Sequence, residues 1–209
     1  CKYYTSKGYV TASLDYTLQT QGKDASIYLM NTEAENAIKA IKEKTDELGY
    51  HISAMAPCGV SAGGTLAMNL AYNGNSVIPV KFVFQMSAPT YFKPSEWSLL
   101  MKVDKLDSEK AFCQMMTGKD IDNYGGDIKA ISPACIVNKN RVPSLIGYGL
   151  KDHCVPLEQK YYLMDAYNKY NVPYDYIAFP KSNHGMYNDL DKLQEFLDKS
   201  IEYADRYFQ

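Results

Sequence analysis

A serine in a glycine-rich pentapeptide has the residue type and spacing for covalent chemistry. Gly59-Val60-Ser61-Ala62-Gly63 fits the pattern G-x-S-x-G and lies between an apolar run and a stretch of small residues. In such a turn from strand to helix, the flanking glycines let the backbone turn sharply and present the serine hydroxyl above a sheet. We therefore predict that Ser61 is a nucleophile, and the alternative is a purely structural glycine-rich turn.

A serine hydroxyl is a poor nucleophile until a base removes its proton, and the chain contains three histidines. His51 precedes the strand that leads to Ser61, so we place it at the opposite end of the sheet, roughly 26 Å away. His153 is adjacent to an acid candidate and is expected to point away from the site. His184 follows the last predicted strand, where open α/β sheets place their sites. His184 is therefore the predicted base, and the alternative is a surface histidine.

The imidazole needs an acidic partner that orients it and stabilises it when it is charged. Asp152 comes shortly after a predicted strand that ends at Gly149, and it is the predicted acid. Asp175 and Asp189 are weaker rivals, because one opens a strand and the other opens the last helix. The alternative for Asp152 is an ordinary helix-capping or surface acid.

The elements that must position these residues alternate along the chain. The pattern predicts strands at 10–15, 52–59, 81–87, 144–149 and 175–179, and helices at 32–48, 62–73, 107–117, 156–170 and 188–206. For the helix at 32–48, Thr32 and Glu35 form a candidate capping box and Gly49 marks the end. This alternation predicts an α/β fold with a mostly parallel sheet covered by helices on both faces.

Residues 90–140 break the alternation and contain no predicted strand. A stretch of this length inside an α/β domain predicts a lid or cap inserted into a single domain that spans residues 1–209. Its apolar side chains are candidates to line a substrate pocket, although core packing is at least as good an explanation. These side chains are Phe92, Trp97, Phe112, Met115 and Met116.

Composition excludes several classes of partner. The 22 Lys and Arg residues nearly balance the 24 Asp and Glu residues, and no long apolar run occurs, so neither nucleic acid nor membrane is an expected partner. The five cysteines form no C-x-x-C pair, which favours free thiols in a reducing, cytoplasmic compartment. Without zinc-type Cys/His spacing or a glycine-rich phosphate loop, we expect neither a metal nor an organic cofactor.

From Gly8 to its C-terminus, the chain resembles α/β-hydrolases of the carboxylesterase and acetylesterase kind, near the hormone-sensitive-lipase-like and prolyl-oligopeptidase-like branches. The resemblance implies that Ser61 is the nucleophile, Asp152 the acid and His184 the base, with the backbone N–H of Ala62 as one oxyanion donor. An arginine that often follows the Asp-Tyr pair of these enzymes is Thr17 here. The matching stretches are Ser13-Leu14-Asp15-Tyr16, Gly59 to Gly64, Ser132-Pro133, Gly149 to Pro156 and Asn183-His184-Gly185.

Two parts of the family pattern are absent from the sequence. These are the His-Gly-Gly-type loop that supplies the remaining oxyanion donors, and the first strands of the sheet. Because a parallel sheet does not leave a slot empty, we expect that residues before Cys1, or another chain, fill a place between residues 10–15 and 52–59.

The resemblance implies hydrolysis of carboxylic esters, such as short-chain acyl esters or acetylated carbohydrates, through an acyl-serine intermediate. Two alternatives remain. One is a serine peptidase of the prolyl-oligopeptidase type, and the other is a non-catalytic binding module on a hydrolase fold.

Overall fold

The centre of the molecule is a parallel four-stranded sheet in the order β1-β2-β3-β4. The computed structural model describes residues 1–18, 25–120, 125–137 and 142–209. All three neighbouring pairs are parallel, and the register places Gln85 opposite both Gly59 and Ile146. The strands are β1 (Cys58–Val60), β2 (Val83–Met86), β3 (Ser144–Gly149) and β4 (Tyr174–Phe179).

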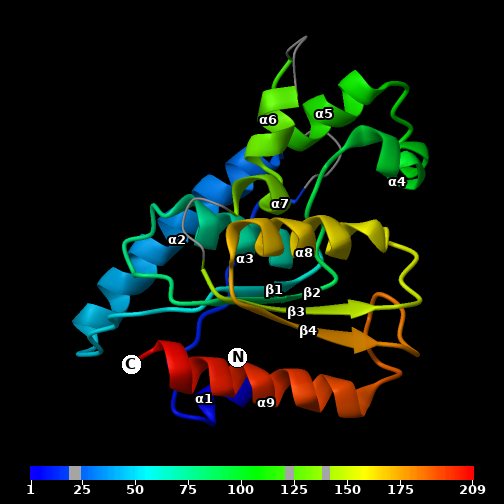
Figure 1. Cartoon of the computed structure of the whole chain (residues 1–209). Helices are drawn as coiled ribbons and strands as arrows, with labels where there is room; N and C mark the ends of the chain where they lie inside the picture. The colour runs from blue at the N-terminus through cyan, green and yellow to red at the C-terminus, as the bar shows by residue number, and fades with distance from the viewer. Residues whose placement is uncertain (19–24, 121–124, 138–141) are drawn as a thin grey trace.

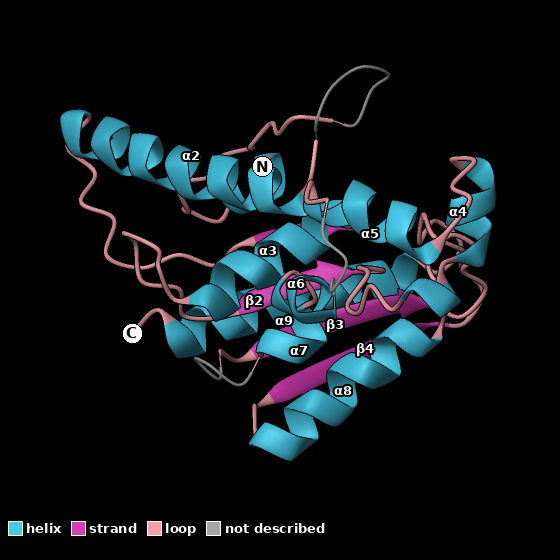
Figure 2. Cartoon of the chain, turned by 90° about the horizontal axis from the view of Figure 1, so that it is seen from above, coloured by secondary structure: helices cyan, strands magenta, loops and turns pink. Residues whose placement is uncertain are grey.

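Helices cover both faces of this sheet, as the alternation of elements predicts. Figure 1 shows α3 and α8 on one face and α1 and α9 on the other, and Figure 2 shows α3 and α8 from above. The predicted α/β fold class is therefore confirmed. The helices that pack against or beside the sheet are α1 (Lys2–Thr5), α2 (Ile27–Glu47), α3 (Ala62–Asn73), α8 (Glu158–Tyr170) and α9 (Leu190–Tyr207). Along the described ranges, the helices are too short or too polar to cross a bilayer.

The core is divided by the sheet, and β3 is its most buried strand because every one of its residues is buried. On the face covered by α3 and α8, the hydroxyl of the fully buried Tyr72 bonds to those of Tyr167 and Ser144, at 2.6 and 3.0 Å. On the other face, Phe196 of α9 is buried in one apolar cluster with Phe82. Strand β3, which precedes Asp152, is therefore held by packing on both faces of the sheet.

The second helix begins earlier than the predicted capping box, so that boundary was wrong. Helix α2 starts at Ile27, and the hydroxyl of Ser26 accepts a hydrogen bond from the Leu29 N–H at 3.1 Å. Thr32 lies one turn inside the helix, where its hydroxyl donates to the Tyr28 carbonyl oxygen. Ser26 therefore does the capping for which Thr32 is a candidate in the sequence.

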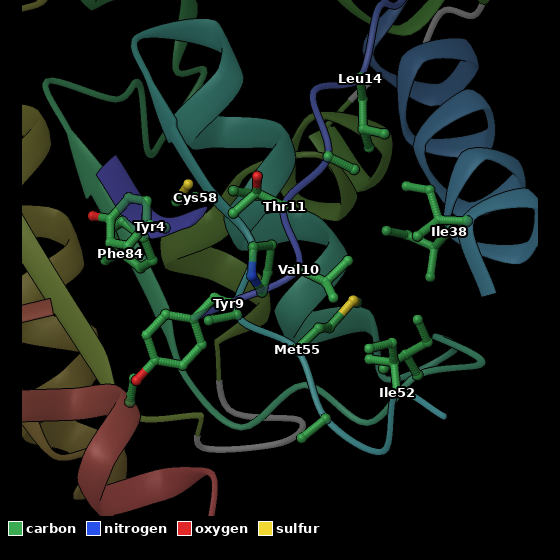
Figure 3. Close-up of a pocket in the computed structure, with 18 of the residues that line it drawn as sticks. Tyr4, Tyr9, Val10, Thr11, Leu14, Ile38, Ile52, Met55, Cys58 and Phe84 are labelled. Atoms are coloured by element: carbon green, nitrogen blue, oxygen red, sulfur yellow. The ribbon is translucent and has the colours of Figure 1, made fainter. Parts of the chain in front are cut away.

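The predicted strand at 10–15 is not a strand in the structure, and the one at 52–59 is reduced to Cys58–Val60 plus a single bridge between Met55 and Val80. The physical reason is that the two segments do not pair with each other. An apolar groove of about 680 Å³ lies between them (Figure 3), lined by side chains that include Val10, Leu14, Ile38 and Ile52. The expected filling of this place by another segment stays a prediction.

The stretch predicted to form a lid contains short helices and, within its described residues, no strand. Gln159 of α8 ties this stretch to the main body, because its side-chain oxygen accepts hydrogen bonds from the N–H groups of Thr90 and Tyr91, each at 2.8 Å. Figure 1 shows α4 above the side of the sheet toward which β3 and β4 point. The elements are η1 (Pro94–Glu96), α4 (Ser98–Val103), α5 (Glu109–Thr117), α6 (Gly125–Ala130) and α7 (Pro133–Ile136).

Candidate active site

Ser61 lies at a sharp turn between β1 and α3. Its backbone has φ 54° and ψ −127°, in the positive-φ region that residues other than glycine rarely adopt. Its N–H donates a hydrogen bond of 2.9 Å to the carbonyl oxygen of Met86, which anchors the turn to the end of β2. Strained backbone held in this way is a common property of functional residues.

The close approach of strand and helix at this turn explains one glycine of the pentapeptide, but not the other. A Cβ atom at Gly59 would lie 2.3 Å from the carbonyl carbon of Gly63, so no side chain fits there. A Cβ atom at Gly63 itself would meet nothing within 4 Å, whereas one at Gly64 would lie 2.8 Å from the Cβ atom of Ala88. Gly59 and Gly64 are therefore the glycines that the packing requires.

Asp152 and His184 meet across two loops that follow neighbouring strands. His184 Nδ1 lies 2.8 Å from Asp152 Oδ2, and the aspartate side chain is fully buried while that of His184 is 27% exposed. The other carboxylate oxygen of Asp152 accepts hydrogen bonds from the N–H groups of Cys154 and Val155, at 2.8 and 3.0 Å. Because a carboxylate only accepts, Nδ1 carries the proton of this bond, and in a neutral imidazole the lone pair is then on Nε2, the arrangement that a general base requires.

Gly149 brings the two loops into contact. We call residues 150–157 the aspartate loop and residues 180–189 the histidine loop. A Cβ atom at Gly149 would lie 2.4 Å from the carbonyl oxygen of Asn183, so only glycine allows this approach. The N–H of Lys151 also donates to the Ser182 carbonyl oxygen at 3.0 Å. The separation between Asp152 and His184 is therefore set by backbone contacts between the loops.

Asp189 stabilises the histidine loop from within, a role that the sequence did not indicate. Its Oδ2 accepts hydrogen bonds from the Ser182 hydroxyl at 2.7 Å and from the Lys181 N–H at 2.9 Å. Burial raises the pKa of Asp189, but these hydrogen bonds outweigh burial and hold the pKa below its usual value. Asp189 is thus a positioning residue of the loop that carries His184.

The remaining rivals for the acid and the base lie elsewhere. The His51 side chain is 86% exposed and faces Asp46 on the far end of α2. His153 is exposed, beside Asp152 in the chain. Asp175, near the start of β4, is half-exposed and lies 3.8 Å from the Lys199 ammonium.

Ser61 is on the same side of the sheet as the paired Asp152 and His184, because all three follow the carboxyl ends of parallel strands. Within the described residues, the Ser61 hydroxyl has no hydrogen-bond partner and is only half-buried. Its pairing with His184 stays a prediction. Ala62 is the first residue of α3, where the backbone N–H has no partner inside the helix and can donate to an oxyanion.

The candidate pocket side chains are mostly covered. Trp97 and Phe112 are buried in one apolar cluster with Phe92, and Met115 and Met116 pack against it half-buried. The indole N–H of Trp97 donates to the Tyr91 carbonyl oxygen at 3.1 Å. This cluster forms the core of the lid stretch, and a role in lining a substrate pocket stays a prediction.

Comparison with known proteins identifies a family for this chain. No curated protein sequence matches the chain. Among solved structures, a carbohydrate esterase from gut microbiota shares 17% identity over 89% of this chain and 71% of its own, with a TM-score of 0.68. Esterase B from Lactobacillus rhamnosis shares 16% identity over 99% and 71%, with a TM-score of 0.71. An acylaminoacyl peptidase shares 18% identity over 88% and 28%, with a TM-score of 0.64.

At these identities the likeness shows a shared fold. The family model named BD-FAE, in contrast, matches residues 1–167, which is most of the sequence and includes Ser61 and Asp152. The chain therefore belongs to the BD-FAE family of the α/β-hydrolase superfamily.

Proposed function

We propose that this protein hydrolyses carboxylic esters through an acyl-serine intermediate. The observation that carries the proposal is the 2.8 Å hydrogen bond between the buried Asp152 carboxylate and His184 Nδ1. It leaves a basic Nε2 on the side of the sheet where the strained turn presents the Ser61 hydroxyl. A buried acid, a partly exposed imidazole and a serine at a helix N-terminus are the parts that acyl transfer needs.

In the proposed reaction, the Ser61 oxygen attacks the ester carbonyl carbon while Nε2 of His184 takes the hydroxyl proton. The carbonyl oxygen becomes an oxyanion that the Ala62 N–H stabilises. His184 then gives its proton to the leaving alcohol as the carbon–oxygen bond of the ester breaks. Water adds to the acyl-serine in the same way and releases the carboxylic acid, which restores both side chains.

The substrate that we propose is a small ester with a short acyl group, including acetyl groups on carbohydrates. Similarity to a carbohydrate esterase and to esterase B supports this class. No organic cofactor takes part in the proposed steps.

The first test compares hydrolysis of p-nitrophenyl acetate, an acetylated oligosaccharide and an aminoacyl p-nitroanilide. Ester turnover is the expected result. The likeness to an acylaminoacyl peptidase favours the peptidase as a second candidate, although this chain spans only 28% of that protein. Cleavage of the anilide without ester turnover would establish the peptidase, and inactivity toward all three would favour a binding module.

The Ser61→Ala variant tests the nucleophile. Loss of a member of such a triad lowers kcat by orders of magnitude, so we expect a decrease of about 10³-fold or more with unchanged thermal stability. Ser53→Ala is a matched control, since Ser53 is exposed and lies outside the site. A fluorophosphonate should label wild type and Ser53→Ala but not Ser61→Ala. If Ser61→Ala kept a tenth of the activity, Ser61 would not be the nucleophile.

A further inference from the structure

The fold brings together three potential metal ligands that the sequence keeps apart. One ligand atom each of Asp152, Cys154 and His184 lies within 4.8 Å of the other two. Asp152 and Cys154 belong to the aspartate loop, while His184 comes from the histidine loop. No spacing typical of a zinc motif links them, so this cluster emerges only from the contact between the loops.

The donor set suits a borderline metal ion. A carboxylate oxygen, a thiolate sulfur and an imidazole nitrogen are all common zinc ligands, at about 2.0–2.3 Å from the metal. Around a tetrahedral zinc ion, such ligand atoms lie roughly 3.4–3.7 Å apart, so shifts of about 1 Å would bring these three into place. A water molecule would supply the fourth ligand.

The surroundings of the cluster allow an ion to enter from solvent. Cys154 is exposed and the His184 side chain is 27% exposed, while the carboxylate of Asp152 forms the buried floor. The Cys154 N–H donates to Asp152 at 2.8 Å, which holds the backbone of Cys154 close to the carboxylate. The thiol itself is outside the proposed catalytic steps.

We propose that Asp152, Cys154 and His184 form a zinc site whose occupation reversibly stops the hydrolase reaction. Zinc would displace the thiol proton to solvent. If zinc binds Nδ1, the ring proton moves from Nδ1 to Nε2 and the imidazole stays neutral, so that Nε2 has no free lone pair. Bound at Nε2, it would instead occupy the base directly. In either case His184 can no longer accept the Ser61 proton, so inhibition rests on the proposed function, whereas binding of the metal does not.

Two measurements with added Zn²⁺ on the metal-free protein test the site. Isothermal titration calorimetry should show one ion per chain for wild type, and ester hydrolysis should fall at least tenfold at saturation and return after EDTA. Cys154→Ala should keep the basal activity, because its backbone N–H still bonds to Asp152. Its half-maximal zinc binding and its half-maximal inhibition should both need a Zn²⁺ concentration more than tenfold higher than in wild type. Cys1→Ala, which removes another exposed thiol, should behave as wild type.

Two results would overturn the proposal: no zinc binding by wild type, or the same zinc affinity in Cys154→Ala. If the protein binds zinc through Cys154 but turns over no ester, the metal site stands and the proposed function fails. Substitution of Co²⁺ for Zn²⁺ gives a second readout, since a thiolate–cobalt charge-transfer band should appear in wild type and disappear in Cys154→Ala.

Discussion

Replacement of Gly149 by alanine tests whether contact between the two loops sets the geometry of the site. The added methyl group would lie 2.4 Å from the Asn183 carbonyl oxygen, and real Cβ contacts essentially never fall below 3.0 Å. The histidine loop must therefore retreat by at least 0.6 Å, the difference between these two distances. Because Asn183 directly precedes His184, the imidazole is expected to move with it.

The expected effect on activity exceeds the effect on stability. A movement of this size stretches the 2.8 Å bond between His184 and Asp152 beyond the usual hydrogen-bond range. Misplacement of a catalytic group by about 1 Å can cost about 10²-fold in rate, so we expect kcat/KM to fall by about 10- to 100-fold. Overpacking costs about 1–3 kcal/mol, which corresponds to a decrease in Tm of roughly 2–12 °C in a domain of this size.

The assay is ester hydrolysis at 25 °C, together with a thermal melt that shows the variant to be folded at that temperature. Gly126→Ala is the matched control, because a Cβ atom there would meet nothing within 4 Å. That variant should retain wild-type kcat/KM. If Gly149→Ala also retained it, backbone contact at Gly149 would not control the position of His184.

Two further predictions concern positioning and capping. Asp189→Asn should lower kcat/KM by loosening the histidine loop, and it should also flatten the acid side of the stability profile. The lowered pKa of Asp189 adds stability that is complete above the pKa of an unfolded aspartate, about 3.9, and is lost as pH falls through the folded pKa. Chemical denaturation between pH 7 and pH 3 measures this loss. If the free energy of unfolding fell with pH equally steeply in wild type and Asp189→Asn, the prediction would be wrong. Ser26→Ala should cost about 1 kcal/mol of unfolding free energy and Thr32→Ala distinctly less, because Ser26 caps α2 while Thr32 lies inside it. A larger loss for Thr32→Ala than for Ser26→Ala would show that Thr32 is the capping residue after all.

Elements whose boundaries depend on their own residues were predictable from the sequence. Strand β3 and helix α3 have the predicted bounds, 144–149 and 62–73, because a continuous buried run and a run of small residues are each flanked by residues that end them. The start of α2 was missed because Ser26 and Thr32 both have side chains suited to capping. The choice between them depends on packing at the start of the helix.

What depends on contacts between distant residues could not be predicted. Residues 10–15 have the composition of a strand, but a strand exists only where a neighbour supplies hydrogen bonds. Likewise, the sequence identified Asp152 and His184 by type and place. It gave no sign that Gly149 lets their loops touch, because Gly149 and Asn183 lie 34 residues apart. It also gave no sign that Asp189 supports the histidine loop, because that contact depends on how residues 182–189 fold back on themselves.

The groove between residues 10–15 and 52–57 implies a gradient of local stability across the sheet. Strand β3 has hydrogen-bonded neighbours on both sides, whereas β1 pairs only with β2. Within the described residues, the backbone of residues 10–15 makes no hydrogen bond at all. Local opening should therefore begin at the groove and reach β3 last, so amide hydrogen exchange should be fastest at 10–15 and slowest in Ser144–Gly149. The turn that carries Ser61 follows β1, which is weakly held, and Asp152 follows β3, which is the most strongly held strand. Fluctuations that separate Ser61 from Asp152 and His184 should therefore start on the side of Ser61.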